Sequence, residues 1–278
     1  MLSIKHNKMN ISLITVNYKN TRITKRFINS LEECYNSEKI KIYIIDNHST
    51  QKSKSELIEI KNKSFLNIHL EFNSENFFYW PAVGNLLSKI YCNQVFPEWT
   101  IICNNDIIFN QRSLFDKLQK LDGDLFNLIG PSIESSQNKD LNPFLKKDLN
   151  LLHRIYWKVY FKSYFFANFL NALRKFSLLR KRNKEEIYKS KHVYAVHGSF
   201  IFFSRYFFIK GGYLDKNFKL YCEELTTAEI SRKIGCKIFH IPELRVFHNN
   251  HSSTKKMKKK LIFELAKESH NYFIRKYK

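Results

Sequence analysis

Apolar residues in the first 130 positions fall into short runs that alternate with segments of helical spacing. In the helical segments the apolar residues recur every three or four positions, as they do on one face of a helix. The segments that predict strands are 11–16, 40–45, 65–72, 99–103 and 125–129, and those that predict helices are 21–35, 55–60, 82–95 and 113–121. Strands that alternate with helices are typical of a parallel sheet covered by helices, so the pattern predicts an α/β fold.

The pattern changes between 143 and 191, where aromatic and basic side chains are interleaved. This stretch has no glycine and, after Pro143, no proline, so it predicts a helical insert. The elements predicted beyond it are a strand at 193–203, a helix at 223–234, short strands at 237–241 and 244–247, and a basic helix from 255. The 278 residues are enough for one large domain or two small ones, and no internal repeat or low-complexity linker divides the chain.

Positive charge is concentrated in two of these segments. Lysine and arginine number 47 against 25 aspartates and glutamates, which gives a net charge of +22. Segment 146–191 carries a net +10 and segment 255–278 a net +7, so the rest of the chain is close to neutral. A local positive surface indicates an anionic partner, which on this ground alone is nucleic acid, acidic lipid or a phosphorylated substrate.

Cysteine and glycine usage exclude several kinds of site. The five cysteines form no CxxC pair, so neither a disulfide framework nor a zinc knuckle is expected, and free thiols indicate a reducing cytoplasm. There is no signal-like apolar stretch at the amino terminus and no run long enough to span a membrane. The seven glycines form neither GxGxxG nor GxxxxGK(S/T). A nucleotide bound to this sheet would therefore need another partner for its diphosphate, and a carboxylate-bound divalent metal is the obvious one.

Asn104, Asn105 and Asp106 come directly after an apolar strand. Ligands of such sheets bind beyond the carboxyl ends of the strands, and Mg²⁺ or Mn²⁺ needs only one or two carboxylates besides substrate phosphates. Asp106 is therefore a candidate metal ligand, with a polar turn as the alternative. Asp46 also follows a strand, and could either accept hydrogen bonds from a base or ribose or belong to a polar turn.

Two further groups could carry chemistry. Glu223 and Glu224 begin a predicted helix, and two adjacent carboxylates raise the pKa of at least one of them, which suits a general base. The alternative is that they only stabilise the positive end of the helix dipole. His248 ends a predicted strand, where an imidazole could complete a metal site or have a purely structural role.

Five segments, in this order, resemble glycosyltransferase family 2, with its GT-A fold, and especially its bacterial rhamnosyltransferase-like members. They are ISLITVNYKN (11–20), KIYIIDNHST (41–50), IICNNDIIF (101–109), GGYLDKNFKLYCEEL (211–225) and SRKIGCKIFHIPELRVFHNNHSS (231–253). The resemblance implies a Rossmann-like, mostly parallel sheet flanked by helices. It also implies a single domain over 1–278. The parts of this domain are a nucleotide-binding half (1–130), the basic aromatic helical insert (143–191), an acceptor and catalytic half (192–254) and a basic C-terminal helix (255–278).

The resemblance also implies an activity and the residues that perform it. The activity is inverting transfer of sugar from a nucleotide-sugar donor, by preference a UDP- or dTDP-sugar, to a glycan or polyprenyl-linked acceptor in bacterial surface polysaccharide, such as capsule or lipopolysaccharide. Asp106 and His248 would bind Mg²⁺ or Mn²⁺, and Glu224 or Glu223 would take the proton of the acceptor. The donor would be bound by Val16, Asn17, Tyr18, Asp46, Asn85, Asn104 and Asn105.

Three positions depart from the family pattern. Glu224 stands where the second acidic residue is usually aspartate, so the role of base could pass to Glu223. Phe78 or a neighbour replaces a glycine expected in the donor loop, and His48 replaces a common glycine after the second strand. These departures leave open an inactive relative that only binds a sugar nucleotide.

The basic insert fits a protein that works at the inner face of the cell membrane. We expect segment 154–182 to place its basic residues on anionic headgroups and its aromatic residues in the interface, the alternative being helices that only pack on the body. The aromatic residues concerned are Tyr156, Trp157, Tyr160, Phe161, Tyr164, Phe165 and Phe169. A basic nucleic-acid-binding protein is a further alternative, but no RRM, KH or zinc pattern supports it and no nucleic acid is expected as a partner.

Overall fold

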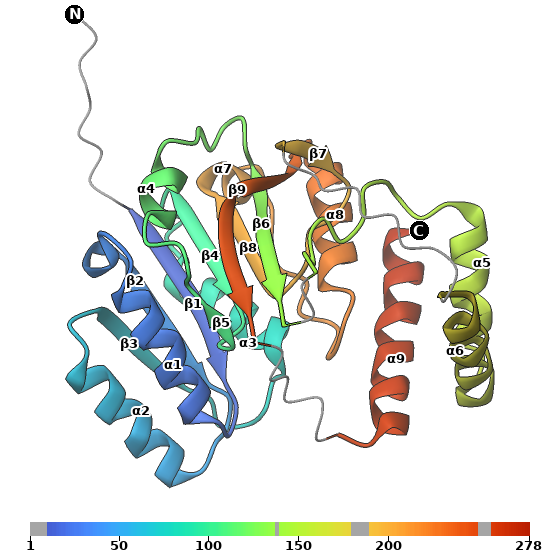
Figure 1. Cartoon of the computed structure of the whole chain (residues 1–278), viewed down its shortest axis with the longest axis horizontal. Helices are drawn as coiled ribbons and strands as arrows, with labels where there is room; N and C mark the ends of the chain where they lie inside the picture. Colours follow the sequence, from blue (N-terminus) through green and yellow to red (C-terminus); the bar gives the residue numbers. More distant parts are fainter. Residues whose placement is uncertain (1–9, 137–138, 179–188, 250–256) are drawn as a thin grey trace, which may run out of the picture.

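The computed structural model describes residues 10–136, 139–178, 189–249 and 257–278. Within these ranges nine strands form one sheet (Figure 1), with the bounds β1 Ile11–Asn17, β2 Lys41–Asp46, β3 Asn67–Phe72, β4 Trp99–Cys103, β5 Ile107–Ile108, β6 Leu128–Ser135, β7 Lys191–Val193, β8 Phe200–Ser204 and β9 Ile238–His248. The strands lie in the order β3-β2-β1-β4-β8-β6-β9-β5, and β7 pairs with β9.

The sheet has a parallel part and a mixed part. β3, β2, β1 and β4 are parallel neighbours, and β6 is parallel to β9. β8 joins the two parts and runs antiparallel to both β4 and β6. Its first residue, Phe200, pairs with Cys103 at the end of β4. The loop before β8 therefore lies at the carboxyl edge of the parallel strands, where ligands of α/β sheets bind.

Helices cover both faces of the sheet (Figure 1). Their bounds are α1 Thr21–Glu32, α2 Gln51–Lys63, α3 Tyr79–Ile90, α4 Leu114–Gln119, α5 Leu151–Tyr160, α6 Tyr164–Leu178, α7 Arg205–Ile209, α8 Glu223–Lys233 and α9 Lys259–Tyr277, with a 3₁₀ turn, η1, at Ser37–Lys39. Leu13 and Ile101 pack on the side of α1, α2 and α4, and their neighbours Ile14 and Ile102 pack on the side of α3, α7 and α8. Successive strand residues point to opposite faces, so a fully apolar strand fills two cores. The predicted α/β class, a Rossmann-like sheet between helices, is confirmed.

The insert and the C-terminal helix lie together beside α8. α9 contacts α8, and α5 and α6 lie on the far side of α9 (Figure 1). Phe263 of α9 packs against Tyr160, Phe161 and Tyr164 of the insert, with ring centroids 5.4 to 6.2 Å apart. The predicted helical character of the insert is confirmed at α5 and α6, and residues 179–188 lie outside the described ranges. None of the described helices is both long and apolar enough to cross a membrane.

Two strand predictions around β6 and β9 are wrong. β6 does not end before Gly130 but continues through Pro131 to Ser135. Proline has no N–H for the ladder, and the pairing with β9 shifts register directly after Pro131, which accommodates it. The predicted strands 237–241 and 244–247 are one strand, β9, and Pro242 between them lies in its bulge.

A third strand prediction, at 193–203, is also wrong. β7 ends at Val193 and β8 begins at Phe200, and a loop separates them. Within the otherwise apolar run, this loop contains His197, Gly198 and Ser199. Because β8 is antiparallel to β4, the loop reaches the carboxyl edge of the sheet.

Candidate active site

Segments that are far apart in the chain meet at the carboxyl edge of the sheet. β1 and β2 end side by side, with Asn17 paired to Asp46. Asp106 follows β4, and the pairing of β5 with β9 places His248 next to it. The loop 194–199 and the start of α8 complete the group. The structure therefore brings together most of the residues that the sequence predicted as a site.

Asp106 and His248 form a buried pair. The Nε2 atom of His248 lies 2.9 Å from Oδ1 of Asp106, and both side chains are less than a tenth exposed. The main chain reinforces this contact, because the N–H of Asn249 donates to the carbonyl of Asp106 at 3.0 Å. The Nδ1 atom of His248 is also buried, and within the described part of the chain it has no hydrogen-bond partner.

This pair suits a divalent metal ion that is shared with a substrate. Carboxylate and imidazole are both ligands of Mn²⁺ and related ions, and an ion bound to phosphates needs only one or two protein ligands. Across the residues that the structure describes, no group of three or more histidine, cysteine, aspartate or glutamate side chains could hold a metal. Asp106 and His248 could supply two ligands, and phosphate oxygens and water would supply the others.

The loop 194–199, which the sequence analysis did not predict, is fixed against its surroundings. The N–H of Asn104 donates to the carbonyl of Ser199 at 2.9 Å, and Oδ1 of Asn142 accepts from the N–H of His197 at 2.7 Å. The Nδ1 atom of His197 lies 2.8 Å from the hydroxyl oxygen of Ser199. These contacts hold the imidazole of His197 at the edge of the sheet.

His197 lies between the two groups to which the sequence assigned chemistry. Its ring centroid is 6.4 Å from that of His248. Burial lowers the pKa of His197, the charge of Glu224 acts to raise it, and His248 acts to lower it. Because the effect of burial is the largest, the ring is neutral at neutral pH, and one nitrogen can donate while the other accepts.

Glu223 and Glu224 are the first residues of α8, and the loop meets them at Gly198. The N–H of Gly198 donates to Oε1 of Glu224 at 3.1 Å. A Cβ atom at Gly198 would lie 2.5 Å from Cγ of Glu223, so this close approach requires glycine. Burial, and then the adjacent Glu224, raise the pKa of Glu223 well above its ordinary value. The pair therefore keeps a proton at a higher pH than an isolated carboxyl group does, a property that suits a general base.

Tyr79 is a further residue of this group that the sequence analysis missed. It is the first residue of α3, and its hydroxyl donates to the carbonyl of Gly198 at 3.4 Å. Burial raises the pKa of Tyr79 well above its ordinary value, and Cys103, Asp106 and the two glutamates raise it further. The phenol therefore stays protonated, and its hydroxyl lies within electrostatic reach of carboxylates at both ends of the site. In the sequence Tyr79 stands in a run of aromatic residues, which predicts only core packing.

Positive φ angles occur at five non-glycine residues that adjoin these groups or the ends of β1 and β2 in sequence. They are Lys19 at 55°, His48 at 61°, Phe78 at 63°, Tyr221 at 62° and Cys222 at 74°. Such conformations cost about 1–3 kcal/mol for each residue with a Cβ atom, and they cluster at functional sites. The family resemblance implies a glycine at His48 and at Phe78 or a neighbour. At His48 and Phe78 the backbone has a φ angle that favours glycine.

Asn17 and Asp46, predicted to contact the nucleoside, are bonded to each other. The amide of Asn17 donates to Oδ1 of Asp46 at 2.8 Å, and the N–H of Ser49 donates to Oδ2 at 3.0 Å. The Thr24 hydroxyl donates to Oδ1 of Asn17, and the amide of Asn105 donates to that hydroxyl, both at 2.9 Å. Asn17 and Asp46 are fully buried. In this structure they therefore hold the ends of β1 and β2 together.

The remaining residues predicted to bind the donor have different surroundings. Val16 packs against the core on the side of α3, and Tyr18 is partly exposed. Asn104 contributes its N–H to the loop contact described above. Asn85 is exposed on α3 and takes part in none of these hydrogen bonds. The predicted donor-binding set is therefore only partly brought together.

No protein-family model and no curated protein matches the sequence, but solved structures match the fold. TarS 1–349 of S. aureus in complex with UDP-GlcNAc has a TM-score of 0.56 and 13 % identity, over 88 % of this chain and 60 % of that one. The mannosyltransferase PcManGT of Pyrobaculum calidifontis, in complex with GDP-Man and Mn²⁺, has a TM-score of 0.55 and 13 % identity, over 94 % and 70 %. GalNAc-T7 with UDP, GalNAc and Mn²⁺ has a TM-score of 0.59 and 13 % identity, over 97 % and 48 %.

These likenesses establish the fold of the chain as GT-A, as the sequence resemblance implied. The chain spans 37 % of the longer TarS structure, so it corresponds to part of that protein. Identities of this size support the fold alone, and the assignment to family 2 stays a prediction.

Proposed function

We propose that the chain is an inverting glycosyltransferase of family 2, from its rhamnosyltransferase-like branch. It would move a hexosyl group from a nucleotide-sugar donor to a glycan or polyprenyl-linked acceptor in bacterial surface polysaccharide synthesis. One observation carries the proposal: on a GT-A fold, the Asp106–His248 pair and the Glu223–Glu224 pair lie at the same edge of the sheet, with His197 between them. A metal-ligand pair and a carboxylate base are the two parts that such a transfer needs.

The solved structures support the donor class. TarS is described with UDP-GlcNAc, PcManGT with GDP-Man and Mn²⁺, and GalNAc-T7 with UDP, GalNAc and Mn²⁺. A nucleotide sugar and a divalent cation are therefore the partners we propose for this chain, with UDP- or dTDP-sugars and Mg²⁺ or Mn²⁺ as the first to test.

In the proposed reaction, Asp106 and His248 would hold the cation, and a bound cation would supply positive charge against the diphosphate of the leaving group. Glu224, or Glu223 in its place, accepts the proton of the acceptor hydroxyl as that oxygen bonds to the anomeric carbon. The bond from this carbon to the diphosphate breaks, and its electron pair leaves with the nucleoside diphosphate. The hydrogen bond from Gly198 to Glu224 fixes the direction of that carboxylate.

This proposal is tested by measuring release of nucleoside diphosphate from a panel of UDP-, dTDP- and GDP-sugars. Each donor is assayed with Mn²⁺, with Mg²⁺ and with a chelator. We expect release from one donor class only, dependent on the metal and faster with an acceptor glycan. Donor binding without release under every condition would instead identify an inactive sugar-nucleotide binder. Absence of both binding and release would reject the proposal.

The proposal includes peripheral binding of the protein to the inner face of the cell membrane. The net charge of +22 and its concentration in the insert and the C-terminal helix support it, since anionic headgroups attract each basic residue near the surface by ~1 kcal/mol.

A further inference from the structure

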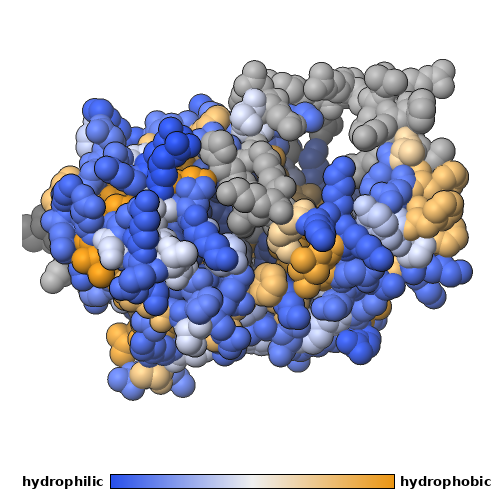
Figure 2. All heavy atoms as spheres, turned by 90° about the horizontal axis from the view of Figure 1, so that it is seen from below, coloured by the Kyte–Doolittle hydropathy of each residue, from blue (hydrophilic) through white to orange (hydrophobic). Residues whose placement is uncertain are grey.

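Helices α5 and α6 expose large apolar side chains to solvent. Leu151, Leu152 and Phe165 are 71 %, 75 % and 74 % exposed. Figure 2 shows hydrophobic residues gathered at the end of the molecule where these helices lie. We call the set the α5–α6 apolar face, and it consists of Leu151, Leu152, Ile155, Val159, Phe165, Phe166 and Phe169. Burial of apolar side chains of this size is favourable, so their joint exposure indicates a binding surface.

This face coincides only in part with the one that the sequence predicts. Tyr160, Phe161 and Tyr164 are not free to enter a membrane, because they pack on Phe263 of α9. Trp157 is partly buried and stacks on Phe161 with centroids 5.6 Å apart. These four aromatic residues therefore fasten the insert to α9. Two others of the predicted set, Phe165 and Phe169, do face outward, together with mainly aliphatic residues of α5.

The exposed apolar residues of α5 lie on one side of the helix. Leu151, Ile155 and Val159 are spaced four residues apart, and residues with this spacing are neighbours on a helix surface. α5 has no buried residue, which is consistent with a helix that still lacks a partner on this side. On α6, Phe165 and Phe169 repeat the same spacing.

The charged residues within α5 and α6 are all positive. Between Asp148 and Glu185 the sequence contains no acidic residue. Lys158 and Lys162 are exposed beside the apolar residues, and the ammonium of Lys162 lies 5.8 Å from the centroid of the Phe166 ring. An apolar surface bordered by cations is complementary to an anionic lipid surface, in which hydrocarbon lies beneath negative headgroups.

Other partners suit this surface less well. Nucleic acid binds by stacking bases on aromatic or guanidinium planes, but the α5 part of the face consists of Leu151, Leu152, Ile155 and Val159. A second copy of the chain would bring together two surfaces of the same positive sign, which repel each other.

We infer that the α5–α6 apolar face docks on anionic lipid membranes, with its aliphatic and phenylalanine side chains in the interface and Lys158 and Lys162 at the headgroups. This inference names the surface responsible for the peripheral membrane binding given under the proposed function, and it rests on that part of the proposal. It does not depend on the transfer reaction.

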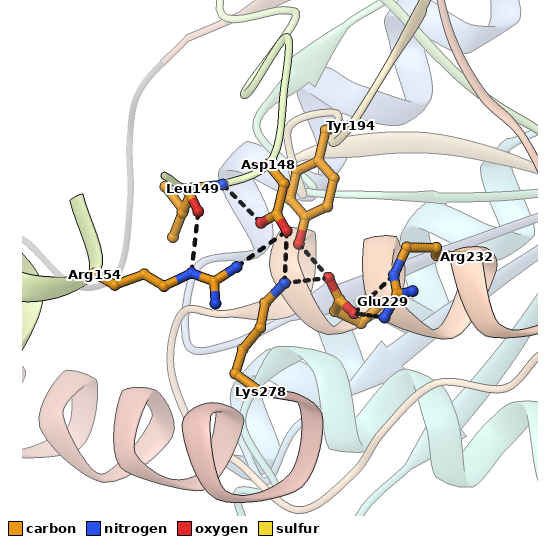
Figure 3. Close-up of polar contacts among 7 residues, drawn as sticks. All are labelled: Asp148, Leu149, Arg154, Tyr194, Glu229, Arg232 and Lys278. Atoms are coloured by element: carbon orange, nitrogen blue, oxygen red, sulfur yellow. Dashed lines mark hydrogen bonds and ion pairs between the residues drawn. The ribbon is translucent and has the colours of Figure 1, made fainter. Parts of the chain in front are cut away.

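Ion pairs fix the direction of this face relative to α8 (Figure 3). The ammonium of Lys278 lies 2.8 Å from Asp148, just before α5, and 2.6 Å from Glu229 in α8. Arg154 of α5 also pairs with Asp148, at 3.3 Å, and the hydroxyl of Tyr194 donates to Glu229 at 2.7 Å. Docking through α5 and α6 would therefore set the orientation of α8, and with it that of the glutamate pair, relative to the membrane.

The inference is tested by co-sedimentation of the full chain with two kinds of vesicle. One contains phosphatidylcholine alone, and the other contains phosphatidylcholine and phosphatidylglycerol in equal parts. We expect binding to the anionic vesicles that is weakened but not abolished in ~0.5 M salt, because apolar insertion is not screened. The combined variant Leu151→Ser, Leu152→Ser and Ile155→Ser should lower the partition coefficient about tenfold or more, since it removes several buried CH₂ groups. Donor hydrolysis in the absence of vesicles should stay at the level of the wild type.

Matched variants separate this face from surface hydrophobicity in general. The control combines Phe65→Ser, Val95→Ser and Leu125→Ser, residues that are 64 %, 75 % and 64 % exposed in other parts of the molecule. We expect it to bind vesicles like the wild type. Equal binding by both triple variants would overturn the assignment of the face and leave the charge-based location standing. Wild-type protein that remains in the supernatant would overturn both the assignment of the face and the charge-based location. Displacement of bound protein by RNA, but not by salt, would overturn both as well.

Discussion

Gly198→Ala should separate the position of the glutamate pair from the other properties of the site. Gly198 lies in the loop before β8, and its N–H donates to Glu224. The substitution adds one methyl group and leaves every ionisable residue unchanged. Any loss of activity would therefore report where the carboxylates are held and not their chemical nature.

The expected size of the effect follows from the geometry. Carbon atoms in contact lie ~3.5–4.0 Å apart, whereas the new Cβ would start 2.5 Å from Cγ of Glu223. Either the side chain of Glu223 or the loop must therefore move by about 1 Å. A displacement of that size costs about 10²-fold in kcat, which corresponds to about 2.7 kcal/mol of transition-state stabilisation.

The assay measures kcat for release of nucleoside diphosphate in the presence of acceptor. The affinity for donor is measured separately. Donor affinity should change little, because the donor is proposed to bind at Asp106 and β1. Gly123→Ala is the matched control: its Cβ would meet Cβ of Ser204 at 3.1 Å, in the turn between α4 and β6. A folded Gly198→Ala enzyme with the kcat of the wild type would refute the proposed role of the pair.

The remaining predictions concern the metal ligands, the base and the ion-pair network. Asp106→Asn should abolish most transfer at limiting Mn²⁺ while leaving the fold intact, as measured by diphosphate release and circular dichroism; equal turnover would reject the metal assignment. Either Glu223→Gln or Glu224→Gln, with Glu224 favoured, should lower kcat by ~10² or more with donor affinity unchanged, and wild-type rates for both would exclude the pair as the base. The pKa of Glu223 is higher in the folded chain than in the unfolded one, so the wild type loses stability as pH rises through the pKa of the folded state. Glutamine carries no charge, so Glu223→Gln should raise the Tm at alkaline pH, with no gain below about pH 4. Lys278→Met leaves the buried Glu229 with fewer partners and should lower stability by about 1–2 kcal/mol, seen as a Tm several degrees lower in thermal melts; an unchanged Tm would mean that the network contributes nothing to stability.

Much of the first half of the fold can be predicted because each element there is indicated by the pattern of its own residues. β4 was predicted at Trp99–Cys103 because five consecutive apolar or β-favouring residues end at a polar turn. α2 was predicted too short, because its start depends on a cap: the hydroxyl of Thr50 accepts from the N–H of Ser53, and the first turn itself is polar. Element type was therefore predicted better than element bounds.

Contacts between distant segments could not be predicted from local pattern. Nothing in the run 193–203 indicates that its second half pairs antiparallel with β4, yet this pairing brings His197 and Gly198 to the site. The proximity of Asp106 and His248 followed from the family resemblance and not from spacing, since 142 positions separate them. The insert gives a similar lesson: its composition predicts a helical surface, but only packing against α9 decides which side chains remain outside.

The position of β8 between β4 and β6 also has a consequence for synthesis on the ribosome. β4 emerges early, but the strand that completes its outer edge begins about 100 residues later, at Phe200. At a synthesis rate of ~5–20 residues per second, that edge stays open for ~5–20 s. During this time β1 to β4 can assemble as a four-stranded parallel sheet. Its free edge at β4 is apolar except for Thr100 and can pair with another nascent chain. The interval makes the half-made protein a candidate client for chaperones that cover exposed strands, and slow codons before β8 would lengthen its exposure.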